Sequence, residues 1–88
     1  MIHHLAADAC IRNVHEIWPE VRAFIEGSEA AMEIDAAALQ RPDTALAQLL
    51  AMAVLRARER GKTLHVTNAP LPLRDQIRVL GLDFVLDE

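Results

Sequence analysis

Few side chains in this 88-residue sequence are spaced for chemistry, and the most prominent is a hydroxyl. Thr44 follows Pro42 and Asp43 and precedes an apolar run that begins at Leu46. Proline resists a helix interior, whereas Asp and Thr often accept a hydrogen bond from the free N–H groups of a first helical turn. The segment therefore predicts a helix that begins at Asp43 or Thr44, with Asp43 favourably placed against the helix dipole.

The other side chains that could do chemistry are not arranged for it. His3 and His4 are adjacent on a predicted strand, so they point to opposite faces and cannot hold one metal ion together. Cys10 is the only cysteine, which excludes an intramolecular disulfide. The carboxylates expected on the surface are Glu16, Glu20, Glu26, Glu29, Glu33, Asp87 and Glu88. Because none has a His or a nucleophile at a matching spacing, and no glycine-rich phosphate loop is present, we expect no enzymatic activity, no metal and no cofactor.

Length and composition limit the range of functions. Eighty-eight residues accommodate one domain with a modest core, so 1–88 is treated as a single domain. The formal charge is −4 and no basic stripe is interleaved with aromatic residues, so nucleic acid is not an expected partner. No apolar run approaches the length of about 18 residues that a membrane-spanning helix needs. We expect a cytoplasmic protein without membrane insertion.

Hydrophobic periodicity predicts an α/β domain. Apolar and polar residues alternate within 31–35 and 63–67, and a long helical stripe lies between these segments. A strand-helix-strand unit is nearly always right-handed and makes its two strands parallel, so the helix should cover one face of the sheet. The opposite face should be exposed to solvent. With further short strands at 2–6 and 84–86, we predict a mixed sheet of about four strands with helices mainly on one face.

Three helices are expected to bury apolar stripes against this sheet. The first occupies 14–27, although Pro19 conflicts with a helix interior and could move its start to Trp18. The second occupies 44–60, and the third carries its stripe over 73–80 and ends at a Gly-Leu pair. The residues expected in the core are Met32, Ile34, Leu46, Leu50, Ala53, Leu64, Val66, Ile77 and Leu80.

One side of the second helix departs from the pattern of an ordinary surface helix. The side opposite its core stripe is neutral or apolar, where charged residues are usual. Single exposed apolar residues are common, but a continuous strip of this kind more often marks a contact surface. Because the strip begins at Thr44, we predict that it binds a protein partner together with Asp43. The strip consists of Thr44, Gln48, Ala51, Met52 and Leu55.

The order of strand, loop, Asp43-Thr44 and apolar helix resembles the phosphorylation-site segment of STAS domains, the family of anti-sigma factor antagonists. The resemblance continues through 61–68 and 73–82, where a basic helix end, a strand, a short helix and a Gly-Leu pair follow in the same order. It covers roughly residues 5–86. Family members usually have a glycine shortly after the Ser or Thr, where this sequence has Ala45-Leu46.

The resemblance implies a bacterial signalling module that binds a protein partner, with phosphorylation of Thr44 controlling the binding. The implied partner is a kinase-like anti-sigma factor, and homodimer formation through the exposed sheet face stays open. In another branch of the family, the domain is the STAS subunit of an ABC-type lipid transport system and braces an ATPase. A different class, a small ligand- or nucleotide-binding domain, would use the strand ends near Asp35 and Asn68.

Overall fold

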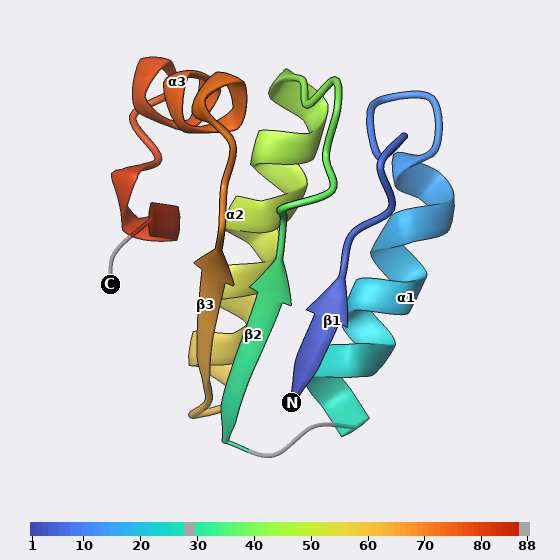
Figure 1. Cartoon of the computed structure of the whole chain (residues 1–88). Coiled ribbons are helices and arrows are strands. Elements are labelled where there is room, and N and C mark those ends of the chain that lie inside the picture. Colours follow the sequence, from blue (N-terminus) through green and yellow to red (C-terminus); the bar gives the residue numbers. More distant parts are fainter. Residues whose placement is uncertain (28–29, 87–88) are drawn as a thin grey trace.

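The computed structural model describes residues 1–27 and 30–86, which form a sheet with helices on one side (Figure 1). The expected surface positions Glu29, Asp87 and Glu88 lie outside the described residues. The strands are β1 (Ile2–His4), β2 (Ala31–Asp35) and β3 (Thr63–Thr67). The helices are α1 (Val14–Gly27), α2 (Thr44–Glu59), α3 (Leu71–Val79) and the 3-10 helix η1 (Asp83–Leu86).

The sheet has the strand order β1-β2-β3, and both of its strand pairs are parallel. Ile2 lies opposite Glu33, and Glu33 in turn lies opposite His65. The bounds predicted for β2 and β3 are confirmed, whereas β1 is shorter than the expected 2–6. The prediction of a mixed sheet of about four strands is wrong, because the described residues contain three strands that all run in one direction.

The segment expected as a fourth strand is the 3-10 helix η1 instead. The Val85 N–H donates to the Leu82 carbonyl at 2.9 Å, which closes a local turn. Val85 is buried, while Phe84 and Leu86 on either side are half-buried. The Arg58 guanidinium of α2 lies 5.5 Å from the centre of the Phe84 ring. Three apolar residues are too short a run to show a period, so contacts with α2, α3 and β3 determine the conformation of this segment.

The helices α1 and α2 lie behind the sheet in Figure 1, and α3 lies beyond the end of β3. Both crossovers between neighbouring parallel strands therefore pass over the same face, which is the usual right-handed arrangement. The core lies between this face and the two helices. All the expected core residues are buried except Leu80, which is half-buried at the end of α3. The largest fully buried side chains are Val21, Ile25, Ile34, Leu46, Leu50, Leu73, Ile77 and Val85.

The helix α1 contains Pro19 and still begins at Val14, so the alternative start near Trp18 is wrong. Pro19 is exposed and lies away from the core, which allows the helix to tolerate its missing N–H. The loop before α1 is held by Asn13, whose side-chain oxygen accepts from the Cys10 N–H at 2.9 Å. The Asn13 amide donates to the Asp8 carbonyl at 3.2 Å. These bonds position the start of α1 next to the loop that leads into α2.

The face of the sheet opposite α1 and α2 carries polar side chains at alternate strand positions. The Thr67 hydroxyl donates to a Glu33 carboxylate oxygen at 2.7 Å. His4 Nδ1 lies 3.4 Å from a carboxylate oxygen of Asp35. His4 and His65 on this face are exposed, and the other polar residues named here are half-buried, so the prediction that this face is open to solvent is confirmed.

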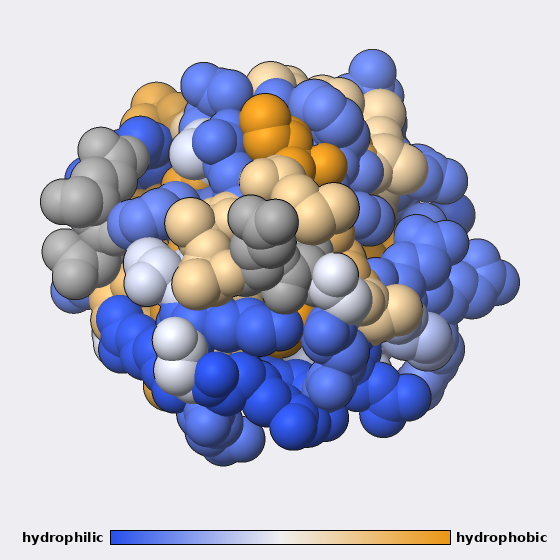
Figure 2. Space-filling model, turned by 90° about the horizontal axis from the view of Figure 1, so that it is seen from below, coloured by the Kyte–Doolittle hydropathy of each residue, from blue (hydrophilic) through white to orange (hydrophobic). Residues whose placement is uncertain are grey.

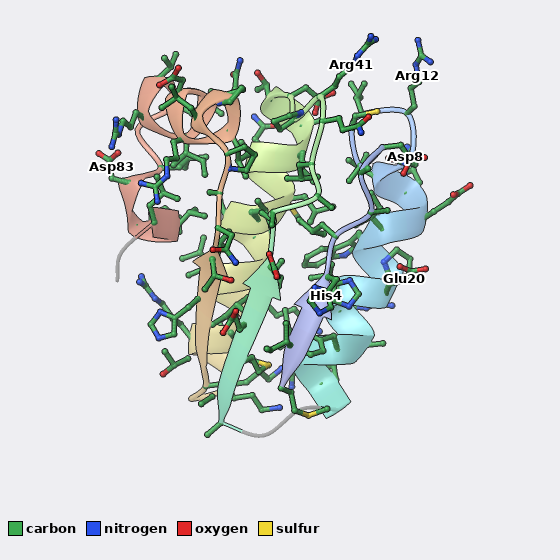
Figure 3. The ribbon with its side chains drawn as sticks, viewed as in Figure 1. His4, Asp8, Arg12, Glu20, Arg41 and Asp83 are labelled. Carbon is green, nitrogen blue, oxygen red and sulfur yellow. The ribbon has the colours of Figure 1, made fainter. Side chains whose placement is uncertain are left out.

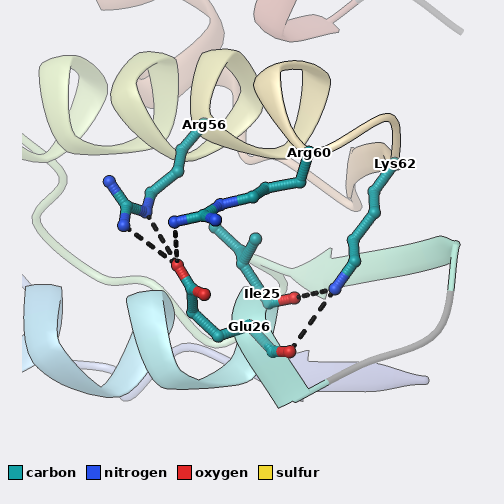
Figure 4. Close-up of polar contacts among 5 residues, drawn as sticks. All are labelled: Ile25, Glu26, Arg56, Arg60 and Lys62. Carbon is teal, nitrogen blue, oxygen red and sulfur yellow. Dashed lines mark hydrogen bonds and ion pairs between the residues drawn. The ribbon is translucent and has the colours of Figure 1, made fainter.

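The C-terminal ends of α1 and α2 are joined by a charged cluster (Figure 4). One carboxylate oxygen of Glu26 accepts from Arg56 Nη2 at 2.9 Å and from Arg60 Nη2 at 2.8 Å. Lys62 Nζ donates to the Ile25 carbonyl at 2.6 Å. Figure 2 views the molecule from this end and shows hydrophilic surface surrounding a smaller hydrophobic area. The ion pairs of Glu26 connect the two helices at the surface, where screening by solvent limits the contribution of each pair to the free energy of unfolding.

We expect Glu26 to contribute to the loss of stability in acid. The hydrogen bond from Arg56, assisted by the charge of Arg60, lowers the pKa of Glu26 from its ordinary value of 4.5. A lowered folded-state pKa gives stabilisation that is complete above the unfolded value and is lost as the pH falls through the folded value. Glu26→Gln should therefore flatten the decrease in the free energy of unfolding below about pH 4.5.

Urea unfolding measured at several pH values on both sides of this range checks the expectation. Glu20→Gln is the matched control, because Glu20 is exposed on the same helix. It should keep the wild-type pH dependence. A wild-type slope in Glu26→Gln would show that the cluster has no linkage to folding.

Candidate functional site

Asp43 is the N-cap of α2, which resolves the choice between Asp43 and Thr44. One carboxylate oxygen of Asp43 accepts from the Leu46 N–H at 3.0 Å, as an N-cap side chain does. The other oxygen accepts from the Ile11 N–H at 2.9 Å in the loop before α1. Asp43 therefore both starts α2 and ties together the loops that follow β1 and β2.

Thr44 is the first residue of α2, and its side chain is exposed. Because Asp43 caps the helix, the Thr44 hydroxyl is not needed for that purpose. It instead donates to the side-chain oxygen of Gln76 on α3 at 3.0 Å. The structure thus places a threonine oxygen at the surface and at the positively polarised end of a helix of 16 residues.

The remaining strip residues on α2 are exposed, with one correction. Gln48 is exposed, as are Met52 (52%) and Leu55 (47%). Ala51 is only 6% exposed, so its predicted place on the exposed strip is wrong. Ala51 lies two turns from both Thr44, which contacts α3, and Arg58, which contacts η1, so its side of α2 faces these two elements. A helical wheel shows the angle of each residue but not which distant element covers it.

The α2 strip borders a groove that the sequence did not reveal. A hollow of about 300 Å³ lies between α1 and α2, and a second of about 240 Å³ continues it along α2. Trp18 and Met52 line both hollows, so we call the continuous feature the α1–α2 groove. Pro19 also lines the groove, and it provides no N–H for the His15 carbonyl one turn earlier. The groove could not be predicted from the sequence, because periodicity placed Trp18, the only tryptophan, in the apolar stripe of α1. In the structure Trp18 is half-buried.

A further hollow of about 400 Å³ lies between the loop before α1 and the loop before α2. Arg12 and Arg41 line it, and both extend outward from the end of the molecule at which the strands finish (Figure 3). Its polar side chains Asn13 and Asp43 already hold the two loops in place. Two guanidinium groups, which pair well with carboxylates or phosphates, thus lie at the end of the molecule where α2 begins.

The strand ends near Asp35 and Asn68, which the ligand-binding alternative would use, lie close together. Asn68 Nδ2 donates to an Asp35 oxygen at 3.3 Å, and that same oxygen accepts from the Ala37 N–H at 2.9 Å. These contacts, led by the Ala37 N–H, lower the pKa of Asp35 below its ordinary value. The Asp35 carboxylate therefore stabilises the turn after β2, and its contacts are internal.

Within residues 1–27 and 30–86, no three His, Cys, Asp or Glu side chains are gathered closely enough to hold a metal ion. None of the helices described has the length and apolarity needed to cross a bilayer. The exposed start of α2 carries the Thr44 hydroxyl, and the α1–α2 groove beside it is lined largely by apolar side chains.

A small parallel sheet, helices on one face and an exposed helix start beside a groove define a small α/β domain. A family model described as "Mlab, STAS domain" matches residues 4–87, which is nearly the whole chain. The chain therefore belongs to the STAS domain family, as the order of elements around Asp43-Thr44 indicated. A search of curated proteins finds no match.

Proposed function

We propose that this STAS domain docks a protein partner at the start of α2 and along the α1–α2 groove, and that phosphorylation of Thr44 weakens docking. The observation that carries the proposal is the position of Thr44. Its hydroxyl is exposed, is free of the capping role that Asp43 fills, and lies at the head of the exposed strip formed by Gln48, Met52 and Leu55. The module would act by binding rather than by catalysis.

The apolar part of the surface would provide affinity. Met52 and Leu55 are about half exposed, and Met52 and Trp18 form the walls of the groove. Aromatic and methionine side chains are enriched in the centres of protein interfaces, where their apolar area leaves water on binding. Arg12 and Arg41 would add polar contacts at the edge of this area.

A phosphate on Thr44 would change the charge of the same surface. It adds nearly two negative charges at neutral pH beside the carboxylate of Asp43. The N-terminus of α2 tolerates an anion in the free domain, so the fold should persist. A partner that covers Thr44 would have to desolvate that charge, which disfavours the complex. This behaviour fits an anti-sigma factor antagonist with a kinase-like anti-sigma partner.

A second candidate is a constitutive subunit of an ABC-type lipid transport system that braces an ATPase. In that role Thr44 would support assembly without being phosphorylated. The Ala45-Leu46 pair, in place of the usual glycine, is consistent with such a branch of the family.

Partner capture with Thr44 variants tests the proposal. The tagged domain carrying Thr44→Glu should retain roughly tenfold less partner than the wild type, because a carboxylate forced into an interface without a counter-charge costs more than about 1.4 kcal/mol. Thr44→Ala should have a milder effect, because it removes a hydroxyl without adding charge. The captured proteins are identified by mass spectrometry, and the source-cell domain is examined for phosphothreonine at position 44.

The matched control is Thr63→Glu, which introduces the same change at an exposed threonine of β3 on the far side of the sheet. It should capture the partner normally. A kinase-like partner with phosphothreonine present supports the signalling role, whereas an ATPase without phosphothreonine supports the transporter role. Equal capture by Thr44→Glu and wild type would exclude the start of α2 from the interface.

A further inference from the structure

The Thr44 hydroxyl reaches across to a helix that is 32 residues away in the chain. It donates to Gln76 Oε1 at 3.0 Å, which links the start of α2 to α3. Gln76 is half-buried, and its hydrogen bond to Thr44 lies at the surface. This contact is not a feature of the Asp-Thr motif, because Gln76 comes from a separate helix.

Core packing fixes the helix that carries Gln76. Leu73 and Ile77 lie on the same helix and are both fully buried, with 0% exposure. They fix the rotation of α3, and α3 packs directly against α2. The amide of Gln76 is therefore kept within reach of position 44 by the fold, and a change at Thr44 need not move α3 for the contact to continue.

A carboxamide side chain can hydrogen-bond to a threonine both before and after phosphorylation. Its oxygen accepts from the hydroxyl of Thr44, and its NH₂ group can donate to a phosphate oxygen after a rotation of the amide. A carboxylate at this position could only accept and would repel a phosphate, whereas an apolar side chain could do neither.

We propose that Gln76 is the positioning residue for the modified site: it accepts from the Thr44 hydroxyl and, after phosphorylation, donates to the phosphate. The inference rests on the proposed phosphorylation of Thr44. In that step Oγ1 bonds to the γ-phosphorus of a nucleoside triphosphate supplied by the partner kinase. The bond from that phosphorus to the β–γ bridging oxygen breaks, the nucleoside diphosphate leaves with the electron pair, and the hydroxyl proton passes to a base of the kinase.

The consequence is that the phosphate is held at the α2 N-terminus in its dianionic form. A hydrogen bond donated to a charged group favours that charged form and lowers its pKa. Phosphothreonine has its second pKa near 6, so a donor at this position increases the negative charge presented at neutral pH. Gln76 would thereby strengthen the repulsion on which the switch depends.

The test is a phosphorus NMR titration of the full chain carrying phosphothreonine at position 44, made by ligation or by genetic encoding. The pKa of the phosphate should be lowest with Gln76, roughly 0.4–1 unit higher in Gln76→Leu, and higher again in Gln76→Glu. Nearby charged residues such as Arg41, Asp43 and Asp75 are the same in all variants. Differences between the variants therefore report on position 76 alone.

Gln40→Leu is the matched control, because Gln40 is an exposed glutamine in the loop leading to α2. It should leave the phosphate pKa unchanged. Equal pKa values in wild type and Gln76→Leu would overturn the inference, and a pKa in Gln76→Glu no higher than wild type would do so even if Gln76→Leu folded poorly. A purely structural role for Gln76 would alter the melting temperature without ordering these pKa values.

The titration needs no partner and no kinase, so its result is separate from that of the capture experiment. If Thr44→Glu weakens partner capture but the phosphate pKa values do not follow the expected order, the role of Gln76 is rejected and the docking surface is kept. If the pKa values follow the order but Thr44→Glu captures the partner normally, the phosphate contact is kept and the docking surface is rejected.

Discussion

Replacing Leu50 with Ala is expected to lower the free energy of unfolding by about 2–5 kcal/mol. Leu50 is fully buried on the side of α2 that faces the sheet. Its removal deletes apolar contacts and leaves a cavity, which the small neighbours Ala53 and Ala57 cannot fill. A domain of this size has a total stability of only about 5–15 kcal/mol, so the variant should unfold at a much lower denaturant concentration. Guanidinium unfolding followed by circular dichroism measures the difference.

Leu55→Ala is the matched control for this experiment. It makes the same chemical change on the same helix, but Leu55 is 47% exposed and does not belong to the core. Its effect should stay within about 0.5 kcal/mol, as is usual for a surface position. Similar losses in the two variants would mean that α2 presents a different face to the sheet.

Introducing Glu at Met52 or Leu55 is expected to abolish most partner binding while the domain stays folded. Both side chains are about half exposed and line the α1–α2 groove, so a single carboxylate can remain hydrated there in the free protein. In a complex the same carboxylate would lose its water without gaining a counter-charge. We expect at least tenfold weaker binding for each variant, and a change of about 0.5 kcal/mol or less in stability. Calorimetric titration with the captured partner provides the affinities.

Val79→Glu controls for the effect of adding a negative charge to an apolar surface position. Val79 is 83% exposed on α3 and does not line the groove. This variant should bind the partner as the wild type does. Full binding by Met52→Glu and Leu55→Glu would move the contact surface elsewhere, and the exposed sheet face around Glu33 and His65 would then be the next surface to examine.

Local patterns in the sequence determined much of this domain. Alternation within 31–35 and 63–67 predicted β2 and β3 with their observed bounds, because side chains on a strand point to opposite faces in turn. The apolar stripe of 44–60 predicted the buried face of α2, and Pro42 with Asp43 predicted where that helix begins. These features depend on residues that are close in the chain, so their spacing carries the information.

Contacts between distant segments decided the rest. The packing of α3 and η1 against α2 buried Ala51 and turned 84–86 into a 3-10 helix rather than a strand. The α1–α2 groove exists because two helices that are separated by β2 lie side by side, and the Thr44–Gln76 hydrogen bond joins residues 32 positions apart. The sequence alone determined a STAS domain with Thr44 at a helix start. Only the tertiary structure decided what surrounds that threonine, because neither periodicity nor capping preference specifies which distant side chain will lie against it.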